Sequence, residues 1–199
     1  MSSDSPYQSR DVTQFERWSH TYEDSWMQRR LFDQVHRAAL DLAAEFPAPA
    51  SVLDVGCGTG RLLRAVAGRW PYTQLIGVDP AQGMVDAARQ RTPGATFYRG
   101  LAESLPLPDA SVDLVLSTMS FHHWRDQTAG VREIARTLRP SGHFILVDVA
   151  PPRWSTWLVP HGSAQPAAIR ERIFDAGGLR ITRQRRVVYP MILATVAAR

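Results

Sequence analysis

The sequence predicts an α/β fold, a doubly wound sandwich in which helices cover both faces of a mostly parallel sheet. Two observations predict it: short β-type runs alternate with amphipathic helical runs between residues 51 and 149, and a glycine-rich turn follows the first run. A third observation, a two-residue link at residues 189–190, predicts one antiparallel strand. With 199 residues the chain is long enough to bury the core of one domain.

The N-terminal part is predicted to be helical. Its apolar residues recur at helical spacing, at Leu31, Val35, Ala38, Ala39, Leu42 and Phe46. Pro47 and Pro49 then end the helix. We therefore expect residues 1–48 to form an N-terminal helical lid segment and residues 49–199 to form the main domain.

The alternating part predicts five parallel strands. They are expected at residues 51–55, 74–78, 96–99, 112–117 and 143–149, the last after a turn at residues 140–142. The helices between them are expected at residues 61–69, 82–91 and about 126–138. Ligands of such a sheet bind at the carboxyl ends of its strands.

The C-terminal part predicts a helix and a hairpin. The helix begins near Pro166 and ends at Gly177 and Gly178, and strands follow at residues 179–188 and 191–197. Only Tyr189 and Pro190 separate these strands, which permits a hairpin and rules out a parallel crossover. The result is a seven-stranded, mostly parallel sheet with one antiparallel strand from the hairpin.

Composition excludes several classes of protein. No apolar stretch is long enough to span a membrane, and residues 1–10 lack the features of a secretory signal, so a cytoplasmic location is expected. The single cysteine, Cys57, can form no internal disulfide. All 23 basic residues are arginine, and the net charge is +4. The arginines are dispersed along the chain, which favours a solvated charged surface over a nucleic-acid partner.

The glycine-rich turn is the strongest single signal. Residues 52–60 read VLDVGCGTG, an apolar strand that ends in three glycines within five residues. Glycine permits positive φ and lets the backbone approach a ligand closely. The sixth position of the dinucleotide fingerprint is Arg61 rather than glycine, and a P-loop requires a lysine that the chain lacks. A nicotinamide cofactor and nucleoside triphosphate hydrolysis are therefore disfavoured.

Residues 53–60 resemble motif I of the class I S-adenosylmethionine (SAM)-dependent methyltransferases, especially the small branch that includes quinone-biosynthesis C-methyltransferases. The resemblance covers about residues 50–150 and continues, in order, at residues 76–80, 100–109, 114–119 and 138–143. It implies a Rossmann-like fold, SAM as cofactor and S-adenosylhomocysteine (SAH) as product.

The resemblance also implies roles for single residues. Asp79, at the end of the second strand, would accept the ribose hydroxyls, and Asp54 would face the ammonium group. Met84 would either lie against adenine or pack in the core. Leu101 stands where an aspartate is frequent, which leaves the adenine amino contact open. The implied cofactor-binding set is Tyr22, Asp54, Gly56, Cys57, Gly58, Gly60, Asp79, Pro80, Met84, Ala102, Glu103, Ser117 and Thr118.

Aromatic residues and histidines gather in the segments expected above the strand ends. We expect a small apolar or aromatic substrate to contact Trp18, Phe121, Trp154 and Trp157, unless these residues only attach the lid to the domain. His122 and His123 follow the fourth strand and are the candidates for a general base, with a structural or positioning role as the alternative.

Several methyltransferase subclasses are disfavoured by missing residues. Residues 117–121 lack the Asp/Asn-Pro-Pro-aromatic motif of DNA amino methylation. Cytosine C5 and arsenic methylation need a thiol near the acceptor, but Cys57 lies in the glycine-rich turn. Asp148 is the one acidic residue near the ends of the fourth and fifth strands, so we expect no metal.

The sequence thus favours a SAM-dependent enzyme that methylates an oxygen, nitrogen or carbon nucleophile of a small molecule. Two alternatives stay open: an RNA or protein methyltransferase, and a non-catalytic SAM- or SAH-binding domain that works through a partner. We expect no membrane association, and either a monomer or a homodimer.

Overall fold

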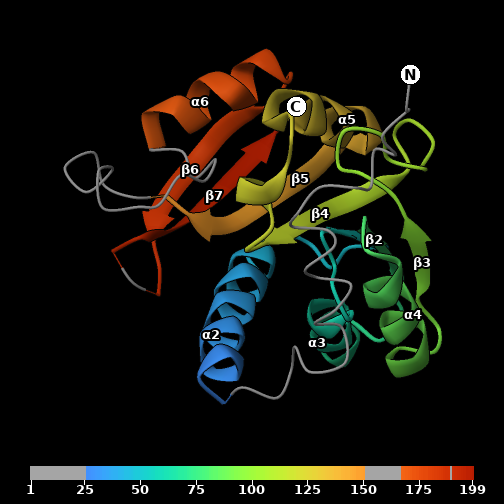
Figure 1. Ribbon diagram of the computed structural model, residues 1–199. Helices are drawn as coiled ribbons and strands as arrows, with labels where there is room; N and C mark the ends of the chain where they lie inside the picture. Colours follow the sequence, from blue (N-terminus) through green and yellow to red (C-terminus); the bar gives the residue numbers. More distant parts are fainter. Residues whose placement is uncertain (1–25, 151–166, 189) are drawn as a thin grey trace, which may run out of the picture.

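The computed structural model describes residues 26–150, 167–188 and 190–199. Their strands form one seven-stranded sheet in the order β3-β2-β1-β4-β5-β7-β6 (Figure 1). The strands are β1 (Ser51–Val55), β2 (Gln74–Asp79), β3 (Thr96–Arg99), β4 (Val112–Thr118), β5 (Leu138–Val149), β6 (Arg180–Arg186) and β7 (Ile192–Ala198). The helices are α2 (Trp26–Ala43), α3 (Arg61–Arg69), α4 (Gln82–Arg91), the 3-10 turn η1 (Phe121–His123), α5 (Gln127–Thr137) and α6 (Ala167–Ala176).

The pairing of the strands confirms the predicted mixed sheet. β1 pairs in parallel with β2 and β4, and β4 pairs in parallel with β5. β7 runs antiparallel to both β5 and β6. The short link between β6 and β7 requires the antiparallel pairing of those two strands. This antiparallel strand lies one position inside the sheet, so β6 forms the edge.

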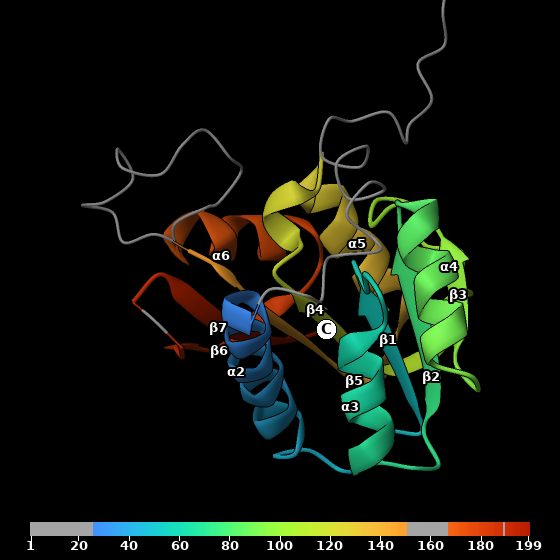
Figure 2. The ribbon, with the colours of Figure 1, turned by 60° about the horizontal axis from the view of Figure 1, so that its bottom comes forward.

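The helices form one layer on each face of the sheet. α2, α3 and α4 cover one face, and α5 and α6 cover the other (Figure 1, Figure 2). Period-two alternation in the strands supplies both cores. In β4, for example, Leu114 and Leu116 pack with α2 and α3, whereas Val115 packs with α5. The result is a three-layer sandwich with two hydrophobic cores.

One predicted turn is instead part of a strand. Residues 140–142 belong to β5, which begins at Leu138 and pairs there with Val112 before the register shifts. Gly142 makes this path possible, because a Cβ at this position would lie 2.9 Å from the carbonyl oxygen of Asp113. The strand therefore starts five residues earlier than expected and carries an irregularity where the turn was predicted.

The topology places a crevice at the end of β1. Strand order reverses at β1, whose neighbours are β2 on one side and β4 on the other. Ligands of open α/β sheets bind at such a switch point, outside the carboxyl ends of the strands. The segments that leave β1, β2 and β4 there begin near Val55, Asp79 and Thr118. None of the helices in the described ranges is long and apolar enough to cross a membrane.

Candidate active site

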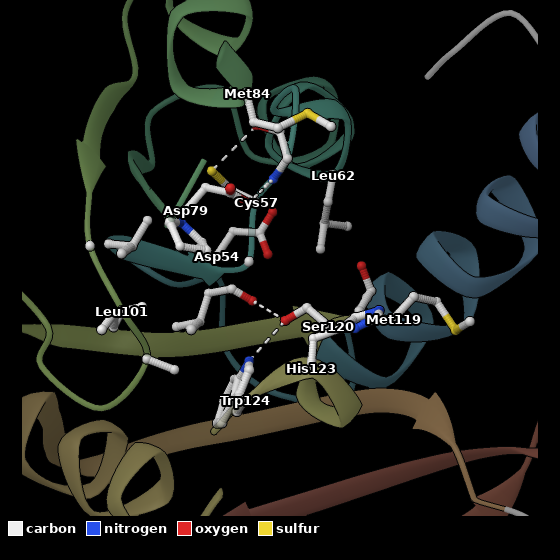
Figure 3. A pocket seen from close by; sticks show the side chains of 18 of the residues that line it. Asp54, Cys57, Leu62, Asp79, Met84, Leu101, Met119, Ser120, His123 and Trp124 are labelled. Atoms are coloured by element: carbon white, nitrogen blue, oxygen red, sulfur yellow. Dashed lines mark hydrogen bonds between the residues drawn. The ribbon is translucent and has the colours of Figure 1, made fainter. Parts of the chain in front are cut away.

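A pocket lies at this switch point, between the ends of β1, β2 and β4 and helix α2 (Figure 3). Ten residues of the implied cofactor-binding set lie on its wall: Asp54, Gly56, Cys57, Gly58, Asp79, Pro80, Met84, Ala102, Glu103 and Thr118. The wall also contains residues that the sequence did not single out for the cofactor, among them Phe32, His36, Leu62, Met119, Ser120 and Trp124.

The glycine-rich loop has the backbone conformation that its glycines predict. Gly56, Gly58 and Gly60 have φ values of 77°, 51° and 77°. A Cβ on Gly56 would lie 2.1 Å from Oγ of Ser120, so the loop passes directly against the segment that follows β4. Gly60 lies off the pocket wall and precedes α3, where a Cβ would lie 3.1 Å from Phe97. Gly60 therefore affects the conformation of the loop without facing the pocket.

Asp79 ties this loop to the end of β2. Its Oδ2 accepts the backbone N–H of Gly58 at 2.9 Å, and its Oδ1 accepts that of Ala81 at 2.9 Å. Burial raises the pKa of Asp79 to about 6, although both hydrogen bonds favour the ionised form. Asp79 is thus a preorganised carboxylate whose position is fixed by two backbone amides.

Asp54 is a buried carboxylate with an unsatisfied oxygen. Its Oδ1 is buried and has no hydrogen-bond partner among the described residues. Burial and the nearby charge of Asp79 together raise the pKa of Asp54 to about 8. Figure 3 shows its side chain in the middle of the pocket. Such a group is costly without a ligand and is suited to a cationic or hydrogen-donating one.

The segment after β3 forms a further part of the wall. Met84 from α4 is 2% exposed and lies on the wall, so it is both a core residue and a lining residue. Leu101, at the position where an aspartate is frequent in similar proteins, also lines the pocket. Glu103 also lines it, but its Oε1 accepts the backbone N–H of Arg125 at 2.8 Å and of Asp126 at 3.1 Å. Glu103 therefore fixes the loop before α5.

Ser120 is a hydrogen-bonding centre that sequence reasoning missed. Its hydroxyl donates to the carbonyl of Val55 at 3.1 Å and accepts Nε1–H of Trp124 at 3.1 Å. Oγ of Ser117 lies 3.2 Å from it, and Ser117 itself is fully buried and off the wall. Ser120 thus links β1, β4 and η1. Its position directly after the fourth strand was the one available signal.

The two candidate histidines occupy different positions. His123 lies on the pocket wall, whereas His122 lies off it and has Nδ1 2.6 Å from Oδ1 of Asp148. Their rings are 4.0 Å apart between centroids. Phe121 is 1% exposed, and its ring packs 4.9 Å from that of Trp124. This placement corrects the expectation for Phe121, which is a core residue because η1 directs its ring away from the pocket.

Helix α2 contributes a wall that the sequence analysis did not assign. Phe32 and His36 lie one turn apart with ring centroids 5.9 Å from each other, and both line the pocket. Their i, i+4 spacing was a usable signal. Met119, directly after β4, has a φ of 52°, a conformation that is uncommon for a non-glycine residue. The predicted residues Trp18, Tyr22, Trp154 and Trp157 lie outside the described residues.

Comparisons with known proteins agree with this geometry. Residues 53–146 match the family model described as a methyltransferase domain. The solved structure of the YcgJ protein from Bacillus subtilis is 31% identical, with a TM-score of 0.63, and the match covers 75% of this chain and 72% of that chain. This chain belongs to the class I SAM-dependent methyltransferase family.

Two curated relatives align with a larger share of this chain than of their own sequences. The uncharacterized methyltransferase YcgJ of B. subtilis is 40% identical over 111 residues, which are 53% of this chain and 43% of the relative. A malonyl-[acyl-carrier protein] O-methyltransferase of Dechloromonas aromatica is 35% identical over 147 residues, 73% and 53% of the respective chains. The chain thus spans about half the length of these curated relatives.

A further solved structure shares the fold of this chain. It is a chain from the complex between the Haloferax volcanii Trm112 methyltransferase activator and a methyltransferase-family protein. The match has a TM-score of 0.76 at 24% identity and covers 92% of this chain and 96% of that chain.

The site fits the family's cofactor. SAM carries a sulfonium and an ammonium group rather than phosphates, so its site needs carboxylates and carbonyl oxygens. The pocket offers the unsatisfied carboxylate of Asp54 and the backbone-held carboxylate of Asp79, beside a glycine loop in left-handed conformation.

Proposed function

We propose that this chain transfers a methyl group from SAM to an oxygen, nitrogen or carbon nucleophile of a small, apolar or aromatic molecule. The observation that carries the proposal is the unsatisfied, buried Oδ1 of Asp54 beside the glycine loop, in a pocket that the apolar side chains of Phe32, Leu62 and Met119 also line. A buried carboxylate of this kind is stabilised by a cation, and SAM is cationic.

The cofactor would be held by the described carboxylates and the loop. Asp54 would face the ammonium group, and Asp79 would accept the ribose hydroxyls while its amide hydrogen bonds keep it in place. Gly56 and Gly58 would allow the backbone close to the ligand, and Met84 would lie against adenine. Tyr22 stays part of this proposal as a residue that closes over the methionine end.

The chemistry asks the protein chiefly to orient and to exclude water. Bound SAM supplies an electrophilic methyl group on sulfur. The chain must hold an acceptor atom in line with the C–S bond, which by itself contributes much of the acceleration. Phe32, Leu62, Met119 and Trp124 present apolar surface on the wall, which supports an apolar or aromatic acceptor and a dry site.

The N-terminal segment and several aromatic residues complete the proposed site. We propose that residues 1–48 cover the site as a lid segment, because α2 brings Phe32 and His36 to the pocket wall. Trp18, Trp154 and Trp157 remain proposed substrate contacts, with His122 and His123 as base candidates. We also propose a cytoplasmic location and a monomeric or homodimeric state.

A second function is favoured by one comparison. The fold neighbour comes from a complex with the Trm112 activator, which supports a version in which a partner protein completes the site. The apolar wall favours the small molecule. A methyl-transfer screen with and without partner proteins separates the two.

The test is calorimetric titration of the purified chain with SAM and SAH. We expect micromolar binding that falls at least about tenfold in Asp54→Asn and Asp79→Asn, since each loses a charged contact. Asp109→Asn is the matched control, because this exposed carboxylate pairs with Arg136 at 2.7 Å away from the pocket. A folded wild-type chain that binds neither ligand would contradict the proposal.

A further inference from the structure

The order of the strands arranges the pocket residues along one direction. From β4 outward the sheet runs β4, β1, β2, β3, so the segment after β4 is followed by Asp54 of β1, Asp79 of β2 and the segment after β3. Asp79 pairs with Arg99, the last residue of β3, so Leu101 lies just beyond Asp79. Figure 3 shows Leu101 and Met119 on opposite sides of Asp54.

This arrangement determines which part of the cofactor would reach Leu101. In the proposed function, on which the present inference rests, Asp54 faces the ammonium group and Asp79 accepts the ribose hydroxyls. The ribose of SAM separates the methionine part from the adenine base. With its ammonium group at β1 and its ribose at β2, the cofactor therefore extends its base toward the segment after β3.

The side chains on this part of the wall are apolar. Leu101 lines the pocket together with Pro80 of the segment after β2, the buried Met84 of α4 and the buried Ala102. Hydrocarbon side chains accept no hydrogen bond, and the thioether of Met84 is at most a weak acceptor. These four side chains thus offer the base contact area but no partner for its 6-amino group.

Backbone carbonyls on the same part of the wall already accept hydrogen bonds. The carbonyl of Leu101 accepts the backbone N–H of Ser104 at 3.2 Å, which closes a tight bridge between these two residues. The carbonyl of Pro80 accepts Nε–H of Arg99 at 3.1 Å. Both carbonyls therefore serve the local fold.

Glu103 is the acidic residue that the structure describes on the wall of this segment. Its Oε1 accepts the backbone N–H groups of Arg125 and Asp126, at 2.8 Å and 3.1 Å. Two hydrogen bonds from one loop fix the carboxylate toward the start of α5. The position that would put a carboxylate beside the base is instead occupied by Leu101.

We propose that this pocket does not recognise the 6-amino group of adenine and that Leu101 is the residue responsible. The base is held by its shape and by apolar contact. A hydrophobic pocket discriminates weakly between ligands that differ by one small group, whereas a site that hydrogen-bonds such a group strongly rejects a ligand without it. The site therefore takes SAM and SAH analogues whose base is unsubstituted purine.

The test compares two ligands and needs no methyl acceptor. Calorimetric titration of the purified chain uses SAH and its 6-deamino analogue, which keeps every ring nitrogen of the base and lacks only the amino group. We expect the two dissociation constants to agree within about threefold. A larger preference of the wild type for SAH would overturn the inference.

A gain-of-recognition variant tests the role of Leu101. In Leu101→Asp a carboxylate replaces the apolar side chain, so the folded variant should bind SAH at least about tenfold more tightly than the deamino analogue. Leu101→Ala is the matched control, because it shortens the side chain without adding an acceptor and should weaken both ligands equally. Equal affinities in folded Leu101→Asp would overturn the assignment to Leu101.

Glu103→Gln tests the other carboxylate of this segment. If Glu103 bound the amino group, the wild type would prefer SAH and this variant would lose the preference, which would contradict the inference. We expect the ratio of the two dissociation constants to stay within about threefold in this variant. A folded wild-type chain that binds neither ligand would contradict the proposed function itself, so the two failures are distinguishable.

Discussion

Two carboxyl groups in the pocket are buried at a cost to the stability of the folded protein. Asp54 and Asp79 both have pKa values above the ordinary 3.8, chiefly because burial disfavours the charged form. The glycine loop and β2 hold the two carboxyl groups close together. A cationic ligand in this pocket would therefore favour their ionised forms.

This residue-scale effect predicts how the ligand-free protein responds to pH. Because the folded pKa values, about 8 for Asp54 and about 6 for Asp79, exceed the unfolded ones, the folded state binds more protons above about pH 4. Stability from these groups is full below about pH 4 and is lost as pH rises through these values. We expect the melting temperature to fall between about pH 5 and about pH 8.5 more steeply in the wild type than in Asp54→Asn.

Differential scanning calorimetry of both proteins across this range measures the effect. Asp113 and Glu133 have pKa values lowered by hydrogen bonds to Arg139 and Arg136, so they titrate below this window. Identical slopes for the wild type and Asp54→Asn would contradict the account, and Asp109→Asn should match the wild type.

The glycine loop is the element on which the site depends most. It leaves β1, turns at three residues of positive φ and enters α3, and it contacts Ser120 of the adjacent segment. Gly56 is required both for its positive φ and because no Cβ fits between it and Ser120.

We predict that Gly56→Ala damages the site severely. Its positive φ strains any residue with a Cβ, and that Cβ would lie 2.1 Å from Oγ of Ser120, which in turn bonds Val55 and Trp124. SAM affinity should fall about tenfold or more. Gly68→Ala is the control, since Gly68 lies in α3 with nothing within 4 Å of an added Cβ. It should raise the unfolding free energy by about 0.5 kcal/mol and leave SAM affinity intact.

Most elements follow from sequence periodicity, because amphipathic patterns and glycine or proline breaks act locally. The bounds of α3, α4 and β1 agree with the expected ranges, and motif I leads directly to the pocket. The path of β5 does not follow from local signals. Gly142 looks like a turn residue, and only the approach of Asp113 from a distant segment shows why it lies in a strand.

The missing parts of the site have the same cause. Ser120, Phe32 and His36 carry no motif, and their roles depend on how β4 and α2 meet across the sheet. His122 and His123 are adjacent in sequence, and only the pairing of β4 with β5 brings Asp148 to one of them. The sequence thus predicted more of the wall residues beside the glycine loop than of those on α2 and after β4.

At the scale of the whole molecule, the core on the α5 and α6 face of the sheet joins the C-terminal part to the site. Phe174 of α6 is fully buried, stacks on Phe144 of β5 at 5.5 Å and lies 6.1 Å from Phe121 of η1. The C-terminal helix therefore supports the turn that carries both histidines.

We predict that Phe174→Ala costs about 3–5 kcal/mol of unfolding free energy, because a buried aromatic ring leaves a cavity between α6 and the sheet. Urea denaturation measures it. Ile169, on the same helix, is 43% exposed, and Ile169→Ala should change stability by less than about 0.5 kcal/mol. Equal costs for the two variants would show that α6 is not packed as described.

The edge of the sheet has a consequence for the behaviour of the protein at high concentration. β6 is the outermost strand, and four of its seven residues are arginines: Arg180, Arg183, Arg185 and Arg186. An open strand with unpaired backbone groups is a template for aggregation, and charged side chains on it oppose the approach of another strand. The arginine-rich run thus keeps the molecules apart, and replacing it with threonines would produce a protein that still folds but precipitates or forms fibrils when concentrated.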